Sequence, residues 1–189
     1  MLKRPQRAAA AVGSSRRSTP AAKSAPAPSP DAPRPDPDAR RLFLEGIAQP
    51  PASLGAPTNP SRVTTLALEH TARGEAGGMR PEGEVMAAEL TEGRRASTLV
   101  TVGVGECATF IAQGGLGVIE VDLYLTSGTG SALRVLAEDP ITGPIAVIGG
   151  RGACFAHSGS GPLAAELHAR VRRGAGVVLV RSFRRGAKP

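Results

Sequence analysis

The chain has 189 residues, which is enough for one domain with a hydrophobic core. Aromatic residues make up 3% and Trp is absent, so the core must be built from Val, Leu, Ile and Ala. We expect such a core to be marginal or to be completed by oligomerisation. Charge is uneven: residues 1–41 hold nine Lys/Arg and three Asp, residues 170–189 hold seven Lys/Arg and no acid, and residues 42–169 are acidic. Basic ends without interleaved aromatic residues are typical of solvated tails and argue against nucleic acid as the partner.

The N-terminal region, residues 1–41, is predicted to be disordered. Residues 1–60 contain twelve of the seventeen prolines, and proline disfavours both helix and sheet interiors. The first 30 residues contain no acid and are rich in Arg, Ser and Ala, which is typical of a plastid transit peptide, and they lack the apolar segment of a secretory signal. No apolar run is long enough to span a membrane.

Residues 42–189 read as an all-β domain. Leu42–Ile47 is a short apolar run, and Val63–Leu68 is β-branched and predicted to be a strand. Further short strands, separated by Gly, Pro, Ser or Asp, are expected near residues 84–90 (strand or short helix), 98–104, 108–112, 117–125, 132–136, 145–148 and 177–180. Leu163–Arg173 is the exception, because Leu163, Leu167 and Val171 recur at helical spacing and predict a short C-terminal helix.

The two cysteines, Cys107 and Cys154, leave two readings open. A bridge between them is one, and buried free thiols are the plainer one, which we favour. Two Cys and three scattered His give no metal-ligand spacing, so we expect neither a metal nor another cofactor.

Four segments in this order resemble the dirigent protein family of land plants, in particular its subgroup with a long N-terminal region. They are MAAELTEG (86–93), LVTVGVGECATFIA (99–112), TSGTGSALRVLAEDP (126–140) and IAVIGGRGACFAHSG (145–159). Upstream, LFLEGI (42–47) is similar to the opening strand of that family. The resemblance implies an eight-stranded antiparallel β-barrel over residues 42–189 that forms a homodimer or homotrimer.

The resemblance also implies a function. Dirigent proteins orient phenoxy radicals of monolignols such as coniferyl alcohol, which a separate oxidase (a laccase or peroxidase) supplies, for stereoselective coupling in lignan and lignin biosynthesis. They have no redox centre of their own and are secreted to the apoplast. In this chain Ala87 and Ala88 replace the paired acids that the family places before Leu-Thr-Glu-Gly.

A dirigent-like pocket would have apolar walls and a few polar groups. The expected walls are Val102, Phe110, Leu125, Val135 and Phe155. The candidate polar groups are Glu89, Asp122, Arg134 and His157. Asp122 faces either the interior, with a raised pKa, or solvent. The alternative for Arg134 is a surface position, and the alternative for His157 is a position at the rim.

Two other classes of function compete with this one. One is a catalytically inactive structural or interaction barrel. The other is a fragment of an asparaginase-like amidohydrolase, because residues 159–186 resemble the C-terminal helix-strand unit of that family.

Overall fold

The computed structural model describes residues 36–53, 61–151 and 153–186, all within one compact unit that spans Pro33–Pro189. The elements in chain order are α1 (Pro37–Gly46), β1 (Ala52–Ser53), α2 (Arg62–Glu75), β2 (Arg80–Leu90), β3 (Arg95–Val102), β4 (Cys107–Gly114), β5 (Val118–Ser127), a 3-10 turn (Gly130–Ala132), β6 (Arg134–Glu138), β7 (Ile145–Ile148), β8 (Phe155–Ala156), β9 (Leu163–Gly174) and β10 (Gly176–Arg185). The expectation of a β-rich fold is therefore confirmed.

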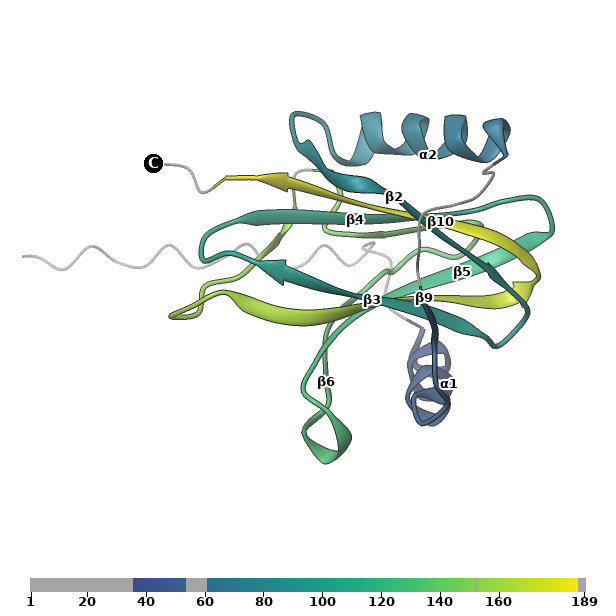
Figure 1. The fold of residues 1–189 in the computed structure, drawn as a ribbon, viewed down its shortest axis with the longest axis horizontal. Coiled ribbons are helices and arrows are strands. Elements are labelled where there is room, and N and C mark those ends of the chain that lie inside the picture. The colour runs from purple at the N-terminus through teal and green to yellow at the C-terminus, as the bar shows by residue number, and fades with distance from the viewer. Residues whose placement is uncertain (1–35, 54–60, 152, 187–189) are drawn as a thin grey trace, which may run out of the picture. The chain divides into compact units, whose positions relative to one another are not determined.

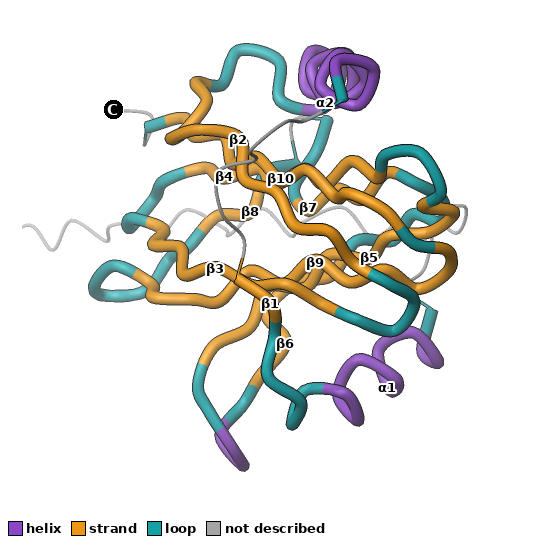
Figure 2. The backbone as a smooth tube through the Cα atoms, turned by 45° about the vertical axis from the view of Figure 1, so that its right-hand side comes forward, coloured by secondary structure: helices purple, strands orange, loops and turns teal. Residues whose placement is uncertain are grey.

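The strands form two layers (Figures 1 and 2). Among the described residues, one sheet has the order β1-β3-β9-β5-β6 and the other β2-β10-β4-β7, with β8 added to β4. Between β2 and β10 every connection crosses from one sheet to the other, except the β5–β6 hairpin and the short link from β7 to β8. This wrapped order is the connectivity of a jelly roll. Because the pairing gives two sheets, a single closed eight-stranded barrel stays a prediction.

The interior between the two sheets is filled by apolar side chains. Each strand alternates, so that β5 turns Val121, Leu123 and Leu125 inward and the intervening residues outward. Phe110 from β4 and Leu167 from β9 meet them there, and all five are completely buried. The sparse aromatic content therefore does not prevent a dense core, since Ala, Val and Leu supply most of it.

The helices lie on the outer faces, α2 over the β10–β4 sheet and α1 over the β9–β5 sheet (Figure 1). Leu68 of α2 is buried against Ile111, Leu179 and Phe183. The expected strand at Val63–Leu68 is wrong, because Thr64 and Leu68 at helical spacing give α2 a face that the sheet buries. The residues 42–47, which resemble an opening strand, lie in α1 (Ile47 caps it).

Two further expectations are corrected. The helix predicted at Leu163–Arg173 is strand β9, which hydrogen-bonds to β3 on one side and β5 on the other. Apolar residues four apart share a face in a strand as well as in a helix, so the pattern did not separate the two. The cysteines are paired, not free: Cys107–Cys154 is a disulfide with 5.4 Å between the Cα atoms. Strand pairing of Ala108 with Phe155 brings their chain neighbours, Cys107 and Cys154, together.

The predicted disordered region, residues 1–41, lies mostly outside the described residues. Its last part does not, because α1 begins at Pro37. Asp36 caps that helix, where its Oδ1 accepts a hydrogen bond from the Asp38 backbone N–H at 2.9 Å.

Candidate functional site: a polar groove beside α1

The outer face of the β9–β5 sheet carries a row of polar side chains. The register places Asp122 opposite Arg170, Tyr124 opposite His168, and Thr126 opposite Glu166. They point outward because their neighbours on each strand, such as Leu123 and Leu167, point into the core. Asp122, Tyr124, Thr126 and His168 are nevertheless buried. The cover comes in part from α1, which contacts this face through Phe43.

Phe43 is the main contact of α1 with the sheet. Its side chain is 1% exposed, and its ring stacks on Tyr124 with 3.9 Å between centroids and 11° between planes. It also meets the His168 ring edge-on at 5.2 Å. At the helix start, the Asp36 carboxylate pairs with Arg172 at 2.7 Å. This hydrogen bond is the largest cause that lowers the pKa of Asp36 and raises that of Arg172.

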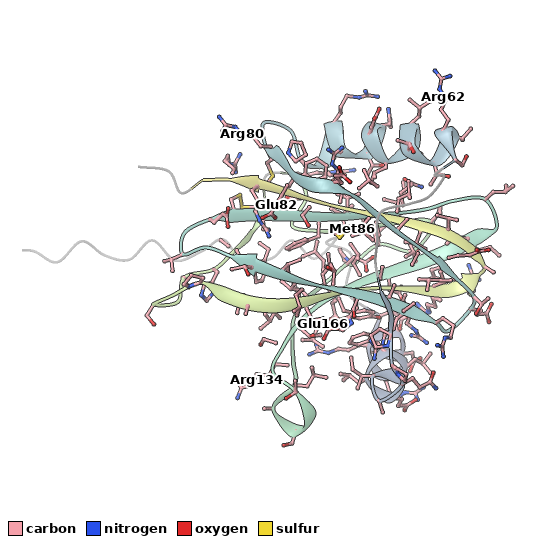
Figure 3. All side chains as sticks on the ribbon, in the orientation of Figure 1. Arg62, Arg80, Glu82, Met86, Arg134 and Glu166 are labelled. Atoms are coloured by element: carbon pink, nitrogen blue, oxygen red, sulfur yellow. A yellow bond between two sulfur atoms is a disulfide. The ribbon has the colours of Figure 1, made fainter. Side chains whose placement is uncertain are left out.

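A groove of about 470 Å³ opens beside α1. One wall is the segment that follows the helix, Ile47–Pro51, and the other is the turn of the β5–β6 hairpin, Gly128–Leu133. The floor consists of Arg95, Glu166 and His168 from β3 and β9. Figure 3 shows Glu166 on the same side of the sheet as α1 and this hairpin. The volume of the groove lies in the range of small-molecule sites.

Arg95 is a buried cation that is already engaged by backbone oxygens. Its Nη2 donates hydrogen bonds to the carbonyls of Ile47 at 2.7 Å and Gln49 at 2.6 Å. Burial is the main cause that lowers the pKa of its guanidinium. Arg95 thus fastens the segment after α1 to β3 and holds that wall of the groove in place.

His168 is held neutral. Burial is the main cause that lowers its pKa, to about 4, and the Arg95 guanidinium acts in the same direction against the attraction of Glu166. Its Nδ1 lies 3.5 Å from Arg95 Nη1, and its Nε2 lies 2.9 Å from Thr126 Oγ1. Arginine has only donors, so these partners assign the proton to Nε2, which donates to Thr126. His168 therefore does not act as a base toward the Thr126 hydroxyl, and no activated nucleophile results.

Glu166 supplies the accessible polar group of the floor. Its side chain is 39% exposed, and its Oε1 accepts a hydrogen bond from Ser97 Oγ at 2.5 Å. The remaining carboxylate oxygen is 3.8 Å from His168 Nε2. Apolar rings and side chains flank it on the walls, from Pro50, Pro51 and Leu133.

A second polar cluster lies under the start of α1. A small cavity of about 40 Å³ is bordered by the carboxyl groups of Asp36, Asp122, Glu138 and Asp139 and by Arg172. Burial is the largest cause that raises the pKa of Asp122 to about 6 and that of Asp139 to about 8. The Oδ2 atoms of Asp122 and Asp139 are buried and have no hydrogen-bond partner among the described residues. The cavity has room for about one or two water molecules, so it does not hold an organic substrate.

The predicted pocket walls lie mostly in the core. Val102, Phe110 and Leu125 are completely buried and pack between the sheets. Phe155 is half-buried and packs against the same cluster, and Val135 is a half-buried residue of β6. Val102, Phe110, Leu125 and Phe155 belong to the interior cluster, whereas Val135 does not, and none of the five lines the groove.

The four predicted polar residues are not brought together. Glu89 is exposed on β2, in the opposite sheet, and Arg134 is exposed at the start of β6 (Figure 3). His157 follows β8, and its Nε2 donates to the Gly161 carbonyl at 2.9 Å. Asp122 has the raised pKa expected of an enclosed acid, but it lies on the outer face of the sheet.

Arg95, Glu166 and His168 are not among the residues predicted from the sequence. The reason is that His168 and Glu166 lie in the segment that was assigned to a helix. Alternation along that segment, with Ala165, Leu167, Ala169 and Val171 on one face, was the signal that places Glu166 and His168 together on the other.

No helix among the described residues is long and apolar enough to cross a membrane. Within the same residues, no group of three or more His, Cys, Asp or Glu side chains is arranged to hold a metal ion. Neither the models of known protein families nor the curated proteins contain a match to this chain.

Proposed function

We propose that this protein is a non-catalytic binding module whose groove beside α1 takes a short, uncharged saccharide. The observation that carries the proposal is the charge balance of the groove floor. Arg95 Nη2 already donates to the carbonyls of Ile47 and Gln49, its Nε is buried, and His168 is neutral. Glu166 keeps an accessible oxygen that accepts hydrogen bonds.

These properties select for neutral, hydroxyl-rich ligands. An anionic ligand is repelled by Glu166, and a cationic one is repelled by Arg95, which is buried and close to His168. Sugar hydroxyls donate to a carboxylate, and the C–H faces of a sugar ring pack on apolar walls such as those of Pro50, Pro51 and Leu133. By analogy, jelly rolls also form lectin domains, which bind sugars.

The test is a titration of the ¹⁵N-labelled protein with glucose, galactose, N-acetylglucosamine and cellobiose, followed by amide chemical shifts. We expect the largest shifts at Gly128, Thr129 and Gly130, the backbone of one groove wall. Glu166→Ala should weaken binding by roughly 10-fold or more, because a hydrogen bond to a charged group is lost. Glu89→Ala, which removes an exposed carboxylate of the opposite sheet, is the matched control. Shifts scattered outside the groove, or an unchanged affinity in Glu166→Ala, would contradict the proposal.

The four ordered motifs support a second candidate, the orientation of phenoxy radicals in the manner of dirigent proteins. Because Phe110 and Leu125 fill the space between the sheets, the groove would have to hold the phenols in this chain. Coniferyl alcohol and a one-electron oxidant are incubated with and without the protein, and the products are separated on a chiral column. An enantiomeric excess that grows with protein concentration supports this function, and racemic products at all concentrations remove it.

We also propose that the protein works outside the cytoplasm. The Cys107–Cys154 disulfide supports this location, since disulfides persist in oxidising compartments. Peptide mapping under non-reducing conditions, with protein isolated from its native source, tests it. Reduced cysteines there would count against the location.

A further inference from the structure

A second and larger cavity lies beneath α2, on the opposite sheet from the polar groove. It has a volume of about 540 Å³ between the C-terminal half of α2, the turn that follows it, and β10. Leu68 and Phe183 line it and are almost completely buried, and Ala72, Ala76 and Met79 complete its apolar surface. The outward-facing row of β10, which includes Arg181 and Phe183, forms the side opposite the helix.

Arg181 is the unusual group of this cavity. It stands in a row of outward-facing residues whose other members are apolar, Val177, Leu179 and Phe183. Its guanidinium carbon lies 5.8 Å from the centre of the Phe183 ring. Its Nε is buried and has no hydrogen-bond partner among the described residues. A buried donor without an acceptor is costly, so a ligand that brings an anionic acceptor to this position is favoured.

The charges around the cavity favour an anion. Arg73 of α2 is a second cation in its lining, and Glu69 is the one acid. The next acid along the helix, Glu75, is engaged elsewhere, because its Oε1 accepts a hydrogen bond from Arg151 Nε at 2.9 Å. The cavity therefore combines apolar walls with an excess of positive charge.

We infer that the cavity beneath α2 binds an amphipathic carboxylate, such as a medium-chain fatty acid. The alkyl chain lies against Leu68, Met79 and Phe183, and the carboxylate accepts hydrogen bonds from Arg181. The volume is ample for a chain of about ten carbons, within the usual size of small-molecule pockets. This site is separate from the saccharide groove and does not depend on it.

The test compares decanoate with decanol, kept below the concentration at which decanoate forms micelles, by isothermal titration calorimetry. The two share an alkyl chain and differ in the headgroup. We expect decanoate to bind at least about 10-fold more tightly than decanol, because only the carboxylate forms a charge-assisted hydrogen bond with Arg181. Arg181→Met should remove this difference and leave the affinity for decanol unchanged. Arg134→Met, which removes an exposed arginine of the other sheet, should change neither affinity.

Equal binding of the two ligands by the unmodified protein overturns the inference, and this comparison needs no variant that must fold. An unchanged preference for decanoate in Arg181→Met overturns it as well. Sedimentation velocity tests the alternative that a second copy of the chain occupies the cavity. If decanoate acts only by dissociating a dimer, the cavity is a subunit interface and the inference is wrong.

Discussion

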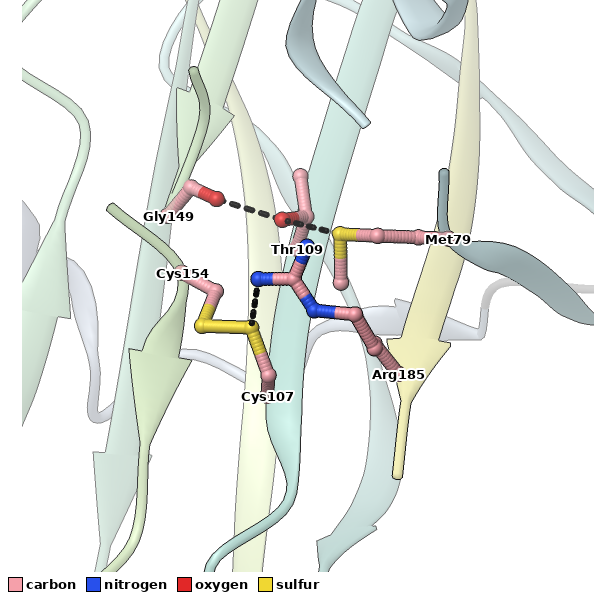
Figure 4. The surroundings of a disulfide bond; sticks show 6 residues. All are labelled: Met79, Cys107, Thr109, Gly149, Cys154 and Arg185. Atoms are coloured by element: carbon pink, nitrogen blue, oxygen red, sulfur yellow. Dashed lines mark hydrogen bonds between the residues drawn. A yellow bond between two sulfur atoms is a disulfide. The ribbon is translucent and has the colours of Figure 1, made fainter. Parts of the chain in front are cut away.

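Removal of the Cys107–Cys154 disulfide should destabilise the protein by about 4 kcal/mol. The bond joins the start of β4 to the segment before β8, and 47 positions separate the two residues in the sequence (Figure 4). Because β4 and β8 already pair next to it, the bond adds little order to the folded state. Its effect arises in the unfolded chain, where closing a loop of this length removes entropy worth about 4 kcal/mol at 25 °C.

The assay is urea unfolding of the oxidised protein, of the same protein with dithiothreitol, and of the double variant Cys107→Ala/Cys154→Ala. With an m value of about 2 kcal/mol/M, the loss shifts the unfolding midpoint by roughly 2 M. The reduced protein and the double variant should unfold at similar midpoints. Small differences are expected from lost contacts of the sulfur, such as the hydrogen bond that Arg185 Nη2 donates to Cys107 Sγ at 3.3 Å.

The double variant is also the control, since its midpoint must not respond to dithiothreitol. A loss below about 1 kcal/mol on reduction would contradict this prediction. It would mean that the unfolded chain between β4 and β8 is already compact, so that the bond removes little entropy. A changed m value with an unchanged extrapolated free energy of unfolding would point to the same cause.

Two further predictions concern the contacts of α1. Phe43→Ala should reduce the free energy of unfolding by about 3–5 kcal/mol, because a buried ring stacked on Tyr124 is lost, and Leu44→Ala on the exposed side of α1 should cost under about 0.5 kcal/mol. An equal effect of the two in urea unfolding would contradict the docking of α1. Because the pKa of Asp122 is raised in the folded protein, protonation of its carboxyl group stabilises the fold. This stabilisation is fully present below pH 3.8 and is lost as the pH rises through about 6. Asp122→Asn should therefore gain up to about 2–3 kcal/mol relative to the unmodified protein between pH 4 and pH 8, measured by urea midpoints, and an unchanged difference would show that Asp122 does not titrate in this range.

Several strands could be predicted from the sequence because local and tertiary preferences agree there. The range of β7, Ile145–Ile148, is the expected one, and β4, β5 and β10 contain the runs 108–112, 117–125 (save its first residue) and 177–180. These runs are rich in apolar residues, many of them β-branched, and Ile145–Ile148 is bounded on both sides, by Pro144 and Gly149. Such a segment has few alternatives to a buried strand, so its neighbours do not need to decide its conformation.

Two segments exchanged their expected conformations because their patterns fit both periods. Val63–Leu68 is β-branched, yet it is helical in α2, where the sheet beneath buries Leu68. Leu163–Arg173 has apolar residues four apart, yet it is strand β9, because β3 and β5 present hydrogen-bonding edges on both sides of it. In both cases the partner that buries the apolar face decided the conformation.

For the candidate site too, the sequence determined some features and the tertiary structure decided others. The sequence alone determined that a β-rich domain with a Val, Leu and Ala core would form, since that follows from composition and turn residues. It could not place Arg95 beside His168, because they are 73 positions apart and meet only when β9 pairs with β3. Nor could it decide that Cys107 and Cys154 pair, since this required β4 to meet β8. Long-range strand pairing decided the site and the disulfide, because residues distant in the chain become neighbours only in the assembled sheets.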